Sequence, residues 1–248
     1  MTKFWNWIKN ENTGESELYL DSAISDETWF GDEITPANFK AELAKHSGNV
    51  TVWINSPGGD CFAASQIYTM LKNHSGKITV KIDGIAASAA SVVAMAGDEV
   101  LISPTGMLMI HNPMTVAAGN RQAMEKAIDL LEEVKQSIIN AYETKSSLSR
   151  AKISQLMDDE TWLNAKKAKQ MGFVDGILFE NNQKSEGSDE KSEELKKETS
   201  DEQTYTAMQY SAVSNINSFI QKVSASAEPA VTGTPIAQLD KRLELLKM

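Results

Sequence analysis

The chain has 248 residues, which is enough for one large domain or for one domain with an appendage. Its net charge of −10 argues against the basic surface of a nucleic-acid-binding protein. No apolar run approaches the ~20 residues that a membrane helix needs. A single cysteine, Cys61, excludes an intrachain disulfide and suits a reducing compartment. We therefore expect a cytoplasmic protein with neither a nucleic-acid nor a membrane partner.

Short apolar segments alternate with helical patterns along the first part of the chain. The expected strands are 18–20, 50–55, 77–82, 99–102 and 107–110. The expected helices begin after a Thr35 cap, after residue 59, at 84 (ending at 97) and at 121 (ending at 142). This alternation predicts an α/β fold with a largely parallel sheet and repeated βαβ units. The 121–142 helix lies outside those units, so we expect it to protrude and to bury its apolar seam against another copy, in a homo-oligomer.

The composition divides the chain into four parts. Residues 1–16 form a leader, and residues 17–180 form the α/β domain. Residues 181–204 are an acidic segment that cannot bury enough apolar surface to offset its ordering entropy, which predicts a disordered linker. Residues 205–248 hold two weakly amphipathic stretches, which predict a short helical tail.

The stretch at 84–88, Gly-Ile-Ala-Ala-Ser, is the first that indicates chemistry. A strand that ends in glycine and turns directly into a helix places Ser88 at the helix amino terminus, where free N–H groups favour an oxyanion. Alanines occupy the places that glycines take in the hydrolase nucleophile elbow. The alternative is a serine in a tightly packed helix, and Ser91 fits that alternative as a residue bonded to its own helix.

Two further motifs lie at predicted strand ends, where parallel sheets carry their sites. Asn-Ser-Pro-Gly-Gly at 55–59 lets backbone N–H groups approach a ligand, as an oxyanion hole requires; the alternative is an ordinary turn. His111 ends an apolar strand and has the pKa of a base that can activate serine; the alternative is a structural histidine. His46 and His74 lie in polar contexts that predict surface residues.

A base of this kind needs a carboxylate to orient it, and three consecutive acids follow at 158–160. Their alternative role is a solvated acidic helix end. We expect Asp158 to be solvated and dispensable.

Together these motifs resemble the Clp protease catalytic subunit family, over roughly residues 17–180. The matching motifs are Asn-Ser-Pro-Gly-Gly at 55–59, Gly-x-Ala-Ala-Ser at 84–88, Met-Ile-His-x-Pro at 109–113, and a closing stretch from 163–165 to 172–175. The resemblance implies a ClpP/crotonase-like fold and a serine-type endopeptidase that needs no cofactor or metal.

The resemblance also implies a role for each motif residue. Ser88 is the nucleophile and His111 the base, while Gly59 and Ala89 supply the N–H groups of the oxyanion hole. The family's acid aligns with Glu160, which departs from the usual aspartate, and Asp159 is the reserve.

Three other stretches look like phage head maturation proteases of this family. They are Phe-Trp-Asn-Trp at 4–7, Trp-Phe-Gly-Asp-Glu at 29–33 and Glu-Thr-Trp at 160–162. This likeness implies an ATP-independent enzyme that forms a ring in the family's manner and cleaves capsid, scaffold or portal precursors inside a prohead. The chain lacks the longer amino-terminal segment of housekeeping members, so a Clp ATPase partner is not expected. The tail would recruit the enzyme to a shell or be trimmed away.

Three alternatives stay open. The chain could be a housekeeping Clp peptidase subunit supplied by an ATPase. It could be a crotonase-type enzyme, which stabilises acyl-CoA enolates without a serine nucleophile. It could also be a catalytically silent shell or scaffold protein that retained the fold for assembly.

Overall fold

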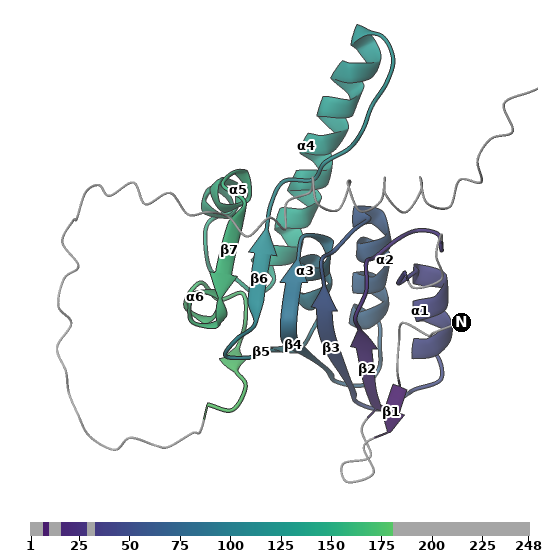
Figure 1. Cartoon of the computed structure of the whole chain (residues 1–248), viewed down its shortest axis with the longest axis vertical. Helices are drawn as coiled ribbons and strands as arrows, with labels where there is room; N and C mark the ends of the chain where they lie inside the picture. Colours follow the sequence, from purple (N-terminus) through teal and green to yellow (C-terminus); the bar gives the residue numbers. More distant parts are fainter. Residues whose placement is uncertain (1–6, 10–15, 29–32, 181–248) are drawn as a thin grey trace, which may run out of the picture. The chain divides into compact units, whose positions relative to one another are not determined.

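The computed structural model describes residues 7–9, 16–28 and 33–180 (Figure 1). The predicted linker and helical tail lie outside these residues. The described strands are β1 (Trp7–Lys9), β2 (Ser16–Leu20), β3 (Val50–Ser56), β4 (Ile78–Ala87), β5 (Glu99–Ile102), β6 (Met107–Ile110), β7 (Thr161–Asn164) and β8 (Gly176–Ile177). The described helices are α1 (Pro36–Leu43), α2 (Cys61–Lys72), α3 (Ala89–Ala94), α4 (Arg121–Glu143), α5 (Arg150–Asp158) and α6 (Ala165–Gln170).

The sheet is largely parallel, which confirms the predicted α/β class. Strands β2, β3, β4, β5 and β8 run parallel in that order, and β1 pairs with β2 in the antiparallel sense. Strand β6 runs parallel to β4, and β7 pairs antiparallel with β6. No helix in the described part of the chain has the length and apolar character needed to cross a membrane.

Strand β4 is longer than its sequence pattern predicts, and it carries an irregularity near its middle. Its first half pairs with β5, while residues 85–87 pair with β6. The register with β3 shifts between Ile82 and Ala86, because four residues of β4 span two of β3. The expectation of a strand that ends at Gly84 and a helix over 84–97 is therefore wrong. Gly84 lies inside the strand, where the side chain of Asn55 occupies the space that a Cβ would need.

Helix α4 projects away from the sheet with its amino-terminal part (Figure 1). Its buried residues lie towards its carboxyl end, whereas the side chains of Ile128 and Leu130 are 66% and 52% exposed. The protruding helix that the sequence predicts is confirmed, and much of its apolar surface is uncovered in the single chain.

Side-chain caps explain where most of the helices begin. Each cap oxygen accepts a hydrogen bond from the backbone N–H three residues later, which satisfies a donor that the helix leaves free. The capping residues are Thr35, Asp60, Asn120, Ser149 and Asn164. The cap that the sequence suggested at Thr35 is confirmed.

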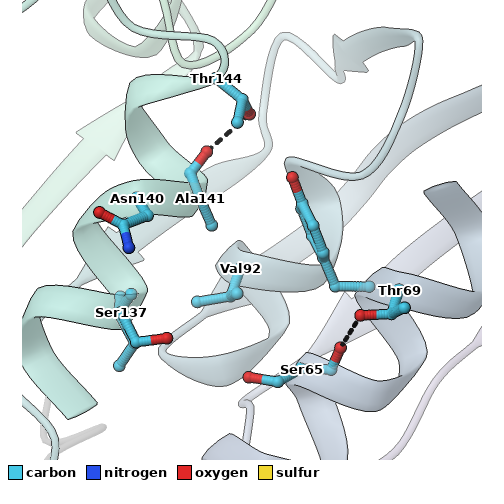
Figure 2. Close-up of a pocket in the computed structure, with 9 residues that line it drawn as sticks. Ser65, Thr69, Val92, Ser137, Asn140, Ala141 and Thr144 are labelled. Carbon is cyan, nitrogen blue, oxygen red and sulfur yellow. Dashed lines mark hydrogen bonds between the residues drawn. The ribbon is translucent and has the colours of Figure 1, made fainter. Parts of the chain in front are cut away.

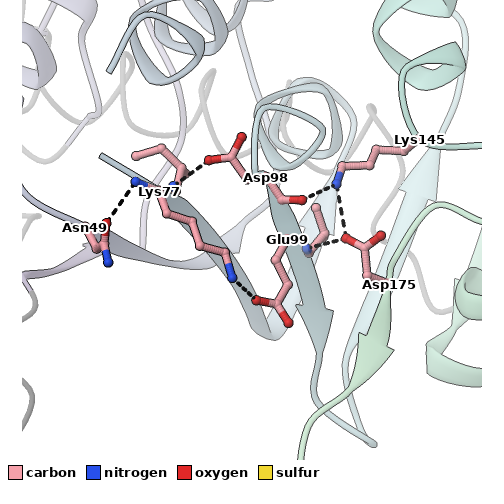
Figure 3. A network of polar contacts seen from close by, with 8 residues as sticks. Asn49, Lys77, Asp98, Glu99, Lys145 and Asp175 are labelled. Carbon is pink, nitrogen blue, oxygen red and sulfur yellow. Dashed lines mark hydrogen bonds and ion pairs between the residues drawn. The ribbon is translucent and has the colours of Figure 1, made fainter. Parts of the chain in front are cut away.

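Carboxylates join the amino ends of neighbouring strands (Figure 3). Ser88 and His111 follow the carboxyl ends of β4 and β6, at the opposite edge of the sheet. Asp98 accepts the backbone N–H of Ile78 at 2.8 Å. Asp175 accepts hydrogen bonds from the backbone N–H of Val100 at 2.7 Å and from the Lys145 Nζ at 3.1 Å. These bonds connect β4, β5 and β8 in addition to the backbone hydrogen bonds that pair the strands.

We predict that Asp175→Ala destabilises the domain by about 1–3 kcal/mol, because the Val100 N–H loses its acceptor and the largely buried Lys145 ammonium loses its carboxylate partner and keeps the Asp98 carbonyl. Urea denaturation should show a lower midpoint. Glu99→Ala is the control: its ion pair with Lys77 is exposed on both sides, so a loss below about 1 kcal/mol is expected. Equal losses of stability in Asp175→Ala and Glu99→Ala would contradict the role of Asp175 in connecting the strands.

Candidate active site

Ser88 is held in an unusual backbone conformation between β4 and α3. Its φ of 54° and ψ of −126° place a residue with a side chain in a region that glycine favours. Its N–H donates to the carbonyl of Met109 at 3.0 Å, so the turn is attached to β6. A strained strand-to-helix turn of this kind presents a nucleophile oxygen to solvent.

His111 directly follows β6, and its ring contacts Ser88. The His111 Nε2 lies 2.7 Å from the Ser88 Oγ, within the range that proton transfer requires. The β4–β6 ladder causes this contact, because it pairs Ala87 with Met109 and so carries both chains to one place. Burial lowers the pKa of His111, and the negative charge of Glu160 partly opposes that shift. The ring is therefore neutral at neutral pH and can accept the hydroxyl proton.

A buried hydrogen-bond chain supports the Ser88 turn from behind. The Ser91 Oγ donates to the carbonyl of Ser88, which confirms the expected bond to its own helix. The Tyr142 hydroxyl of α4 lies 2.8 Å from the Ser91 Oγ. Burial raises the pKa of Tyr142, so its hydroxyl remains a donor. The role of Tyr142 was not predicted, although its place four residues beyond Ile138 on the helix seam indicates burial.

The two glycines at 58 and 59 bring their loop against the nucleophile turn. A Cβ on Gly58, whose φ is 91°, would overlap Ser88 and its neighbours. A Cβ on Gly59, whose φ is 146°, would overlap the carbonyl of Ile24. Among the described residues, neither the Gly59 N–H nor the Ala89 N–H has an acceptor. Both donors are therefore free to bind a developing oxyanion.

The three acids have different surroundings. Glu160 is exposed, with a φ of 45°, and it is the acid of this group whose charge raises the pKa of His111. No hydrogen bond joins it to His111 in the described residues. Asp159 is exposed as well. Asp158 is exposed, as expected, but it also accepts hydrogen bonds from Lys135 and Asn112.

Comparison with known proteins identifies the family. The Clp protease family model matches residues 7–181. This chain belongs to the Clp protease family. It is 32% identical over 142 residues to the ATP-dependent Clp protease proteolytic subunit 1 of Chlamydia abortus, covering 56% of this chain and 74% of the relative. It is 31% identical over 133 residues to the ATP-dependent Clp protease proteolytic subunit of Bacteroides fragilis strain ATCC 25285, covering 53% of this chain and 64% of the relative. Membership of the Clp protease family implies serine peptidase activity.

A separate hollow of about 360 Å³ lies between α2, α3 and α4 of this Clp family chain (Figure 2). Ser65, Thr69 and Thr144 line it, but each of these hydroxyls donates to a carbonyl of its own helix. Because it contains neither Ser88 nor His111, this hollow is separate from the expected catalytic site. In residues 7–9, 16–28 and 33–180, no three His, Cys, Asp or Glu side chains are grouped as a metal site requires.

We predict that Glu160→Gln lowers kcat by about 10- to 10⁴-fold, because an amide neither stabilises nor orients the charged imidazole. The pH profile gives a second readout. Activity rises as His111 loses its proton, so the acid limb of the wild type should lie below the ordinary histidine value of about 6.5. Glu160→Gln removes the negative charge that raises the pKa of His111, so the acid limb of this variant should move to a still lower pH.

Asp159→Asn is the comparison, and it should affect both quantities less than Glu160→Gln does. A larger loss at Asp159 would transfer the role of the acid to that residue.

Proposed function

We propose that this chain is a serine endopeptidase with Ser88 as nucleophile and His111 as general base. The observation that carries the proposal is the 2.7 Å contact between the His111 Nε2 and the Ser88 Oγ. Few structural roles explain a strained serine in contact with a histidine whose pKa is lowered. A catalytically silent shell protein or a crotonase-type enzyme would need neither feature.

The reaction proceeds in two halves. His111 takes the Ser88 proton while the Oγ attacks the peptide carbonyl carbon, and the N–H groups of Gly59 and Ala89 bind the resulting oxyanion. His111 then gives its proton to the leaving amine, and the C–N bond breaks to leave an acyl-enzyme. A water molecule, deprotonated by His111, attacks the ester carbon, and His111 returns the proton to the Ser88 Oγ as the C–O bond breaks and the acid product leaves. Glu160 orients the imidazole and stabilises its charged form.

Within this activity, we propose that the biological role is head maturation of a phage or prophage, without an ATPase. The support comes from the stretches at 4–7, 29–33 and 160–162, which look like phage members of the family. The substrates would be capsid, scaffold or portal precursors, cleaved in the host cytoplasm or the prohead interior. The tail beyond residue 180 would recruit the enzyme to the shell or be trimmed.

A second candidate is a housekeeping Clp peptidase that works with an ATPase. The names of the relatives favour it, since those proteins are called ATP-dependent proteolytic subunits. The two roles differ in what delivers the substrate.

We predict that the purified enzyme cleaves the capsid or scaffold precursor encoded beside its gene without any ATPase. Ser88→Ala should lower the rate by on the order of 10⁴-fold or more, because the nucleophile is lost while the fold remains. Gel analysis of the products measures the cleavage rate, and labelling by a fluorophosphonate measures the reactivity of Ser88.

Near-normal cleavage by Ser88→Ala would overturn the peptidase assignment. Cleavage that appears only after a Clp ATPase and ATP are added would replace the head-maturation role with the housekeeping role.

We also predict a homo-oligomer, with a ring as the expected form, because the exposed apolar side chains of α4 need a partner. Ile128→Asp should shift sedimentation at micromolar concentration towards smaller species. Gln122→Asp places the same side chain on a face of α4 that carries neither Ile128 nor Leu130, and it should leave assembly intact. A monomeric wild type would contradict the prediction.

A further inference from the structure

Lys135 is a nearly buried lysine at the start of the buried carboxyl-terminal part of α4. Its side chain is 11% exposed, and it lies on the buried side of α4 with Ile138 and Tyr142. An ammonium group in such a place destabilises the fold unless a partner compensates for the lost water. The partner is Asp158, whose Oδ1 lies 2.6 Å from the Lys135 Nζ.

The same carboxylate oxygen binds a third residue. The Asn112 Nδ2 donates to the Asp158 Oδ1 at 2.9 Å. The other amide atom, the Asn112 Oδ1, is buried without a partner among the described residues. An unpaired buried oxygen is unfavourable, so the bond to Asp158 holds this side chain in an orientation it would not otherwise keep. Lys135, Asp158 and Asn112, here named the Lys135 clamp, thus join α4, the end of α5 and the segment after β6.

The Lys135 clamp lies beside the expected catalytic groups in the sequence. Asn112 directly follows His111, and Asp158 precedes Glu160 by two residues. The β6–β7 ladder ends at the pair of Ile110 and Thr161, so strand pairing stops just before His111. Residues 111–118 have no regular structure. The Asn112–Asp158 bond is therefore the next constraint on the chain that carries the base.

We propose that Lys135 and Asp158 are positioning residues, which hold His111 against Ser88 through Asn112. This inference rests on the proposed roles of Ser88 and His111. Lys135 fixes the Asp158 carboxylate, and that carboxylate fixes the segment of His111. Because a displacement of about 1 Å in a catalytic group can slow a reaction by about 100-fold, this constraint should affect catalysis more than substrate binding.

A pair that only stabilises the fold offers a matched control in the same chain. The Lys145 side chain is 12% exposed and its partner Asp175 is 48% exposed, against 11% and 52% for Lys135 and Asp158. The Lys145 pair joins the amino ends of the strands (Figure 3), at the opposite edge of the sheet from Ser88. Lys135→Met and Lys145→Met therefore remove equivalent ammonium groups, of which one is near the site.

The test measures kcat and KM on a short fluorogenic peptide, and the rate at which a fluorophosphonate modifies Ser88 with loss of fluoride. We expect Lys135→Met and Asp158→Asn to lower kcat and the labelling rate by about tenfold or more, with KM within about twofold of the wild type. Lys135→Arg should recover most of the loss. Lys145→Met should lower the denaturation midpoint and leave kcat unchanged.

The double variant Lys135→Met with Asp158→Asn should be no slower than the slower single variant, because both substitutions break one clamp. Wild-type kcat in folded Lys135→Met, or in Asp158→Asn should the first not fold, would overturn the proposal. An equal kcat loss in Lys145→Met would overturn it too, since stability alone would then explain the effect. Failure of the wild type to label at Ser88 would instead refute the proposed function.

Discussion

The contact between Ser88 and His111 depends on how β4 divides its hydrogen bonds. The first half of the strand pairs with β5, and after the irregularity at 83–85 the last residues pair with β6. This change of neighbour places Ala87 beside Met109, so the residues that follow the two strands meet. Gly84 permits the irregularity because it has no Cβ, and the Asn55 side chain occupies the space that a Cβ would need. The contact between the two side chains is thus a consequence of strand pairing.

Helix α4 is connected by hydrogen bonds to the segments that carry Ser88 and His111. Tyr142 reaches the carbonyl of Ser88 through Ser91. Lys135 contacts the segment after His111 through Asp158 and Asn112. The same helix leaves apolar side chains exposed further along its length. One element therefore combines contacts to the segments of Ser88 and His111 with exposed apolar side chains.

The carboxylate bonds that stabilise the sheet and the residues proposed to react lie at opposite edges of it, at the amino and carboxyl ends of the strands. The carboxylates of Asp98 and Asp175 connect strands at their amino ends, where no reacting group lies. At the carboxyl ends the structure accepts a strained serine and two N–H groups without acceptors among the described residues. Such features destabilise a fold, and they persist where the surroundings determine them strongly. The bonds at the amino ends offset part of that loss.

The sequence by itself determined the features that depend on neighbouring residues. Periodicity predicted most strands and helices, including α4, and the motifs predicted that Ser88 and His111 share a site. Only the tertiary structure showed that β4 continues past Gly84, because the pairing with β6 overrides the local signal for a turn. It also decided the environment of Asp158, whose partners Lys135 and Asn112 lie 23 and 46 residues away. Contacts over such distances in the chain leave no local pattern, since folding alone brings their residues together.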